Sequence, residues 1–387
     1  MKQNRMKSAA DGLVRVRSLA PMTRRQMMRG TGTLGAAALG VAASGGFRPA
    51  LAETNIKAMV WEGYDVFLEG GDFLAKNDLT LDKTYIGAAE EIIAKLRLNP
   101  REVDVSSPYF IQVDFMAAEG LLRPLDLEKI PNFKNLFPAI VDAARNNMTY
   151  EDQWYSVPFT WASIPLMYNA DEVTDPMESW MDMLRPEFKG KSAIPADPTS
   201  VFATWGRVVT GNQSPNRMTL AELDETIKFL IDMKKNHLRT IAASYGELGD
   251  LFARKEILVC EGAEWVAPLA GEVRVAWSYP KEGTMTYVEG FSMGVEASDP
   301  DAVYALINNA LSVEGQVAGA EYNGLPITNA EALPMLSEAN RATYPYDDIA
   351  SFFTTNLRIE EMYLLEADGT NATWDDYIKG WETVMKA

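Results

Sequence analysis

The sequence predicts an α/β protein built from two lobes. Candidate strands and helices alternate along the chain, which is the pattern of a mostly parallel sheet covered by helices. The length of 387 residues exceeds what a single hydrophobic core usually holds, and this favours two lobes. An apolar fraction of 47% and a charged fraction of 23% are ordinary for a globular protein, so wholesale disorder is excluded.

In the first part of the chain the expected elements are a strand at 56–61, a helix at 85–96, a short strand at 103–107 and a helix at 110–119. The first helix is predicted because its apolar residues recur at helical spacing and Asn99-Pro100 follows them. Ligands of such sheets bind beyond the carboxyl ends of the strands. Trp61 and Ser107 end the two strands, so both are candidate ligand contacts.

The segment 153–169 is long, nearly uncharged and contains two prolines, Pro158 and Pro165. We interpret it as an extended stretch that crosses between the lobes. The elements expected after it are a strand ending at 196–198, helices at 199–209 and 220–235, a strand at 257–262, a helix at 264–270, strands at 273–278 and 291–296, and helices at 299–311 and 374–384.

Residues 1–52 are expected to be an export signal. They hold nine Lys and Arg residues and one acid, Asp11, so the remainder of the chain is strongly acidic. Arg24-Arg25 precedes an uncharged Gly- and Ala-rich run over 30–46, and Ala50-Leu51-Ala52 offers a small-x-small cleavage pattern. The arrangement resembles a twin-arginine (Tat) signal and implies a periplasmic protein. A basic tail beside a buried helix is the alternative.

Replacing both Arg24 and Arg25 with Lys should leave the precursor in the cytoplasm, because the twin-arginine route requires the pair. Immunoblots of cytoplasmic and periplasmic fractions test this. Mature protein that begins at Glu53 outside the cytoplasm would refute the Tat assignment.

Composition excludes several kinds of site. The formal net charge of −18 argues against a nucleic-acid surface, which needs a basic face. One Cys, Cys260, allows no intrachain disulfide and no multi-Cys metal site. One His, His237, excludes His-rich metal sites, so we expect no metal and no cofactor.

Several segments together resemble a known family. They are Trp61-x-x-Tyr64, Ser107-x-Tyr109, Tyr155-Ser-Val-Pro-Phe-Thr-Trp161, Leu166-Met-Tyr-Asn169, Ser179-Trp180, Leu184-Arg-Pro-Glu-Phe-Lys-Gly190, Asp197, Tyr279-Pro-Lys-Glu-Gly283 and Leu325-Pro-Ile-Thr-Asn329. In this order they resemble the spermidine/putrescine-binding proteins of ABC importers, within the bacterial extracellular solute-binding proteins. The resemblance covers nearly all of the chain after residue 52.

The resemblance implies a two-lobe periplasmic binding fold of the second type, with the ligand in the cleft between the lobes. Crossings are expected near Phe159–Met167 and Glu289–Met293. Lobe 1 would comprise 53–158 plus 291–330, and lobe 2 would comprise 159–290 plus 331–387.

The resemblance also implies a ligand site in which carboxylates hold ammonium groups and aromatic faces cover methylene groups. The candidate ligand-binding residues are Trp61, Tyr64, Ser107, Tyr109, Asp197, Glu261, Tyr287 and Glu289. Ser200, Cys260 and Leu325 stand where the family commonly has an acid or an aromatic residue. A changed specificity is therefore open. Glu360 is expected to be an exposed acid, outside the site.

We therefore expect a monomeric, non-enzymatic receptor that hands a small cationic solute, such as putrescine or spermidine, to an ABC permease in the inner membrane. An amino-acid derivative, an opine-like compound or a quaternary amine are alternative ligands. A secreted hydrolase that uses Asp197 and Glu289 as acid and base is a different alternative. An extracellular adhesin or sensor subunit is a third.

Overall fold

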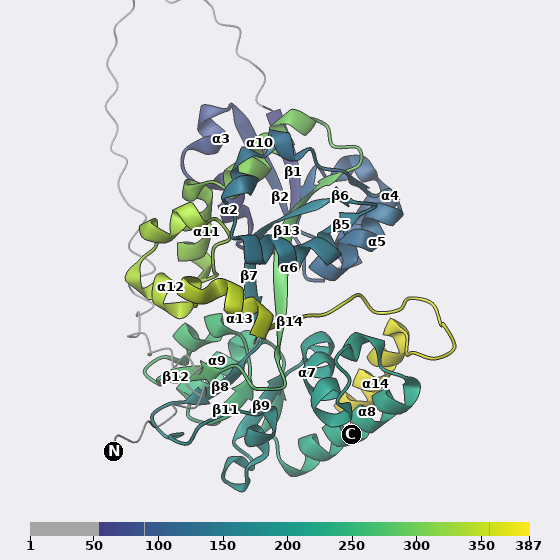
Figure 1. Ribbon diagram of the computed structural model, residues 1–387, viewed down its shortest axis with the longest axis vertical. Helices are drawn as coiled ribbons and strands as arrows, with labels where there is room; N and C mark the ends of the chain where they lie inside the picture. The colour runs from purple at the N-terminus through teal and green to yellow at the C-terminus, as the bar shows by residue number, and fades with distance from the viewer. Residues whose placement is uncertain (1–53, 89, 356) are drawn as a thin grey trace, which may run out of the picture.

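The computed structural model describes residues 54–88, 90–355 and 357–387, and the expected export signal lies outside them. Two α/β lobes lie one above the other in Figure 1, each built on its own sheet. The predicted fold class is confirmed. Within the described ranges, no helix has the length and apolar character needed to cross a membrane.

The sheet of the first lobe has seven strands and is mixed. The core of the sheet is parallel, because β1 pairs in parallel with β2 and with β3. The strands are β1 (Thr54–Val60), β2 (Leu79–Tyr85), β3 (Val105–Ser106), β4 (Leu122–Arg123), β7 (Ser156–Ser163), β13 (Thr284–Gly294) and β14 (Leu357–Ile359). The helices of this lobe are α2 (Asp65–Glu69), α3 (Phe73–Lys76), α4 (Glu90–Leu98), α5 (Val113–Ala118), α6 (Pro138–Met148), α10 (Pro300–Ala310) and α11 (Val313–Asn323).

The second lobe is built on a five-stranded sheet of order β10-β9-β11-β8-β12. Its strands are β8 (Leu166–Asn169), β9 (Ser192–Pro195), β10 (Thr240–Ala242), β11 (Val259–Glu261) and β12 (Val275–Ser278). Four α-helices belong to this part of the molecule: α7 (Pro198–Thr210), α8 (Leu220–Asn236), α9 (Tyr245–Ala253) and α14 (Trp374–Lys386). α14 packs on α8 and α7, so the last described helix belongs to this lobe.

The chain passes between the two sheets at three places. β7 of the first sheet is followed by β8 of the second, as the extended segment 153–169 predicted, and β12 of the second sheet is followed by β13 of the first. β14 then pairs with β13, and the chain continues to α14 on the second lobe. The long antiparallel pair of β7 and β13 stands between the lobes in Figure 1. The lobe boundaries given above by residue number stay a prediction.

Two predicted elements were wrong in detail. Residues 85–88 do not belong to the first long helix: β2 runs to Tyr85, and the described part of α4 begins at Glu90. β2 was not predicted because most of its residues are polar and exposed, which is usual for an edge strand. Residues 264–270 form a 3₁₀ helix, because Pro268 cannot donate the hydrogen bond that an α-helix needs there.

Two smaller sheet-associated helices also escaped prediction. α6 begins with Pro138, a residue suited to a first helical position, but its apolar face is short. α9 contains two glycines, which lower its intrinsic helix propensity. Both are held by packing against their lobes.

Candidate functional site

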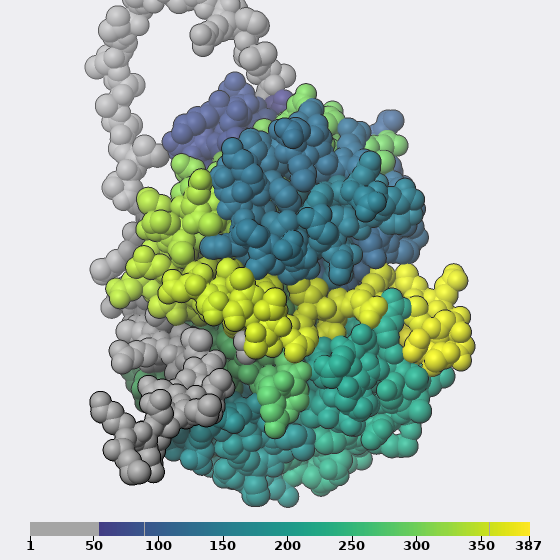
Figure 2. Space-filling view, in the orientation of Figure 1, coloured from purple at the N-terminus to yellow at the C-terminus, as the bar shows by residue number. Residues whose placement is uncertain are grey.

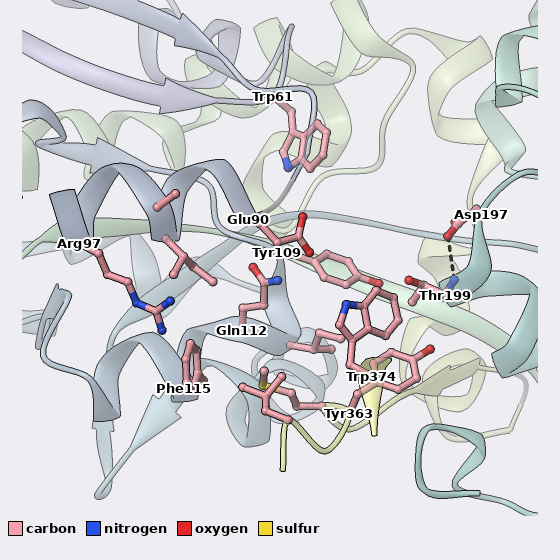
Figure 3. A pocket seen from close by; sticks show the side chains of 15 residues that line it. Trp61, Glu90, Arg97, Tyr109, Gln112, Phe115, Asp197, Thr199, Tyr363 and Trp374 are labelled. Atoms are coloured by element: carbon pink, nitrogen blue, oxygen red, sulfur yellow. Dashed lines mark hydrogen bonds between the residues drawn. The ribbon is translucent and has the colours of Figure 1, made fainter. Parts of the chain in front are cut away.

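A cavity of about 590 Å³ lies between the lobes, within the usual size range of small-ligand pockets. Residues from both lobes line it, and Figure 3 shows Trp61 and Tyr109 of the first lobe facing Asp197 and Thr199 of the second. Its aromatic lining residues are Trp61, Tyr109, Phe115, Tyr363 and Trp374. Such walls can cover the apolar part of a ligand and attract a cation.

Trp61, Tyr109 and Asp197 are the predicted site residues that line this cavity. Trp61 directly follows β1, and its backbone N–H donates to Ser107 Oγ at 3.3 Å. Ser107 itself is fully buried behind Trp61. The parallel pairing of β1 with β3 is what brings these two strand ends together, as the alternation of elements predicted.

Asp197 caps the N-terminus of α7. Its Oδ1 accepts from the backbone N–H groups of Thr199 at 3.0 Å and Ser200 at 3.4 Å, while the Tyr245 hydroxyl donates to Oδ2 at 2.9 Å. A carboxylate at this position is stabilised by the helix dipole. No basic side chain of the described residues pairs with it. Asp197 is thus an anchored negative charge at the wall of the cavity.

Glu289 is a buried carboxylate whose Oε2 has no hydrogen-bond partner among the described residues. It lies on β13, two residues from Tyr287 and so on the same face of the strand, directly before a bulge. Burial raises the pKa of Glu289 to about 8. The group is therefore held in a place where its charged form needs a counter-charge that the described protein does not provide.

Tyr64 and Tyr287 accompany Glu289. Tyr64 packs edge to face on Phe159, with ring centroids 5.0 Å apart. Burial raises the pKa of Tyr64, and the nearby Glu289 raises it further. Burial likewise raises the pKa of Tyr287, with Glu264 and then Glu289 adding to the effect. Neither tyrosine lines the cavity described above, but both lie close to Glu289.

Glu261 lies at the end of β11 and is fully buried. Its carboxylate accepts from Thr204 Oγ1 at 3.2 Å and from Trp205 Nε1 at 3.0 Å. Burial, and then the charge of Asp197, raise the pKa of Glu261 to about 8. Its oxygens are occupied by protein donors, and it does not line the cavity. The structure therefore places it behind the site, with Cys260 beside it in the core.

Glu264 forms a third buried acid group, at the point where β7 ends. It accepts from the backbone N–H of Ser163 at 3.1 Å, from the Ser163 hydroxyl, and from the Tyr279 hydroxyl at 3.2 Å. Burial raises the pKa of Glu264 to about 7. This network ties the second lobe to the strand that crosses between the lobes.

The expectation for Glu360 was wrong. This residue is 3% exposed, and its carboxylate pairs with Arg207 of α7 at 2.5 Å. Burial raises the pKa of Glu360, and the Arg207 guanidinium lowers it. The pair holds the chain after β14 against the second lobe.

The sequence interpretation missed the part of the cavity wall formed by Gln112, Thr199, Tyr363 and Trp374. Gln112 lies three residues after Tyr109, in the predicted helix 110–119. Tyr363 and Trp374 flank a polar loop near the end of the chain, and their rings lie 4.6 Å apart. Aromatic residues beside a polar loop were the one available signal for this wall.

The unliganded protein is expected to lose stability as the pH rises from about 5 to about 8. Glu261, Glu264 and Glu289 have pKa values of about 8, 7 and 8 in the folded chain, above the ordinary 4.5. In this range the folded state binds more protons than the unfolded state, so the free energy of unfolding falls with pH. Thermal melts at several pH values measure it, and Glu289→Gln should reduce the slope. A melting temperature that rises through this range would contradict the prediction.

Comparison with known proteins gives a consistent result. Residues 71–345 match the family model described as bacterial extracellular solute-binding protein. The spermidine/putrescine-binding periplasmic protein of Escherichia coli (strain K12) is 28% identical over 254 residues, which cover 64% of this chain and 70% of the relative. The putrescine-binding periplasmic protein PotF of the same strain is 26% identical over 293 residues, covering 70% and 77%.

Solved structures agree on the fold. The crystal structure of the spermidine/putrescine ABC transporter substrate-binding protein PotD from Streptococcus pneumoniae matches with a TM-score of 0.68 at 18% identity. The match covers 86% of this chain and 98% of the other. The family resemblance and the fold predicted from the sequence are confirmed.

Proposed function

Because the chain belongs to the bacterial extracellular solute-binding proteins, we propose that its ligand is a small cationic solute of the polyamine class, such as putrescine or spermidine. The receptor would deliver it from the periplasm to an ABC permease in the inner membrane. The observation that carries the proposal is that two acids, Asp197 and Glu289, accompany aromatic side chains and have no basic partner among the described residues.

Glu289 lacks a compensating positive charge among the described residues. A buried carboxylate without a hydrogen-bond partner is unfavourable, and a protonated amine would supply both a positive charge and N–H donors. The faces of Trp61 and Tyr109, which line the cavity, can cover the methylene groups between the ammonium groups. The relatives in Escherichia coli are a spermidine/putrescine-binding and a putrescine-binding protein, which supports the same ligand class.

Arg97 bears on the alternative of an amino-acid-like ligand. It lines the cavity, but its Nε and Nη2 already donate to Glu119 at 2.8 and 2.6 Å. The charge of the guanidinium is thus already compensated, and a ligand carboxylate would have to compete with Glu119 for it. The alternative of a hydrolase is not supported, because the family binds solutes and is not enzymatic.

A thermal-shift screen followed by calorimetry tests the proposal. Putrescine, spermidine and agmatine should raise the melting temperature, whereas glycine and γ-aminobutyrate should have little effect, because their carboxylates would face Asp197 and Glu289. If the zwitterions bind and none of the amines does, the ligand class is wrong.

Closure of the two lobes around the ligand can be tested separately. Scattering should show a smaller radius of gyration with the best amine than without it, because closure depends on contacts with both lobes. An unchanged radius across all ligands would argue against a trap that closes between the lobes.

A further inference from the structure

The cavity extends well beyond Asp197, the lining carboxylate proposed to hold an ammonium group. Figure 3 shows Asp197 and Thr199 at one end and Arg97 and Phe115 at the other, with Glu90, Tyr109 and Gln112 between them. We name the end near Arg97 the outer chamber. Its walls are Ile93 and Ala94 of α4, Phe115 of α5, and Met362 and Leu365 of the chain after β14.

The walls of the outer chamber are mainly apolar. Arg97 lies over the ring of Phe115, with its guanidinium carbon 5.6 Å from the ring centroid, and its Nε and Nη2 donate to Glu119. Its charge at the edge of the chamber is therefore compensated by Glu119. An apolar segment of a ligand would lose contact with water here.

Two polar atoms without partners lie along the same cavity. Tyr363 is 5% exposed, and its hydroxyl has no hydrogen-bond partner among the described residues. The buried Oε1 of Gln112 also has none. Burial raises the pKa of Tyr363, and Tyr109 and Asp197 are among the charges that add to this, so the phenol lies near both. Buried polar atoms of this kind are normally satisfied by a partner, and the cavity is where one would bind.

The wall that carries Tyr363 is fixed in place. Arg207 pairs with Glu360, Asn216 donates to the backbone carbonyl of Glu361 at 2.8 Å, and the backbone N–H of Trp374 donates to the carbonyl of Leu364 at 2.7 Å. Residues near the end of the chain, yellow in Figure 2, lie between the two lobes on the visible face. The outer chamber is thus enclosed on one side by an anchored segment.

We propose that the outer chamber is a second subsite, which holds the far part of an extended amine: an apolar chain with a second N–H group. The N–H group would donate to Gln112 Oε1, and the methylene groups would lie against Ala94, Phe115 and Leu365. The preferred ligand is then longer than putrescine. This inference rests on the proposed function for the ammonium group at Asp197.

The test uses α,ω-diamines of four, six, eight and ten carbons and calorimetry on the full mature chain. Affinity should rise with length, by about fourfold for each methylene group that becomes buried, and it should level off when the chamber is full. Ala94→Trp fills the chamber and should abolish the gain in affinity for the longer diamines. Leu98→Trp, on an exposed part of the same helix, is the matched control and should keep that gain.

Gln112→Met keeps the length of the side chain and removes its acceptor. It should weaken spermidine binding by about tenfold, the usual effect of a lost hydrogen bond to a charged group, and weaken putrescine binding less. Equal affinity across the diamines, with no effect of Ala94→Trp, would overturn the subsite while leaving the proposed function intact. Failure of every diamine to bind would instead overturn the proposed function.

Discussion

Replacing Glu289 with Gln should lower the affinity for spermidine by between 30-fold and several thousand-fold. Removing one partner of a desolvated charge pair costs roughly 2–5 kcal/mol, which corresponds to that range. The substitution removes the negative charge without breaking a hydrogen bond of the protein, because Glu289 Oε2 makes none among the described residues. Asp197→Asn should have an effect in the same range, since Asn caps a helix as well as Asp does and so preserves α7.

Calorimetry on each variant measures the affinity. Glu187→Gln is the matched control: this acid is exposed and makes no ion pair within the described part of the chain, so its variant should bind like wild type. If Glu289→Gln and Asp197→Asn both bind spermidine like wild type, the ligand is not held there as a cation.

Binding of an amine beside Glu289 should release a proton from its carboxyl group. With a pKa of about 8, Glu289 is mostly protonated at pH 7 in the free protein, and an ammonium group favours its charged form. Binding should therefore release up to one proton at pH 7 and strengthen as the pH rises toward 8. Heats measured in buffers of different ionisation enthalpy give the number of protons, and Glu289→Gln should reduce it.

Breaking the Arg207–Glu360 pair should have the largest effect on stability. Both side chains are almost fully buried, at 2% and 4% exposure, so Arg207→Met leaves the charge of Glu360 without compensation. Loss of one partner of a buried pair typically costs about 3–5 kcal/mol. Urea unfolding measures the change.

The double variant Arg207→Met with Glu360→Leu is the informative comparison. It removes both charges, so it should recover most of the stability that the single variant loses. A single variant within about 1 kcal/mol of wild type would show that the pair does not hold the chain after β14.

The site residues at strand ends could be predicted from the sequence, because each lies next to a strand that the local sequence pattern indicates. Trp61 follows β1 of the first sheet and Asp197 comes just after β9 of the second, and ligands of such sheets bind beyond the carboxyl ends of the strands. Glu289 was identified only through the resemblance. Its isolation from any partner depends on β7, Tyr64 and the bulge after it, which no local pattern encodes.

The wall formed by Tyr363 and Trp374 could not be predicted in the same way. These residues reach the cavity because Glu360 binds an arginine 153 positions earlier in the chain. The pattern of residues 357–362 fits an exposed strand end equally well, which is why Glu360 was expected to be exposed. Long-range pairing of this kind leaves no periodic signal in the sequence.

The position of this wall in the chain has a consequence for biosynthesis. Trp61 precedes nearly all other residues of the cavity, whereas Tyr363 and Trp374 follow nearly all of them. A nascent chain can therefore form both sheets before the cavity is enclosed. Ligand affinity arises only when the final segment docks, so binding reports on complete synthesis as well as on folding.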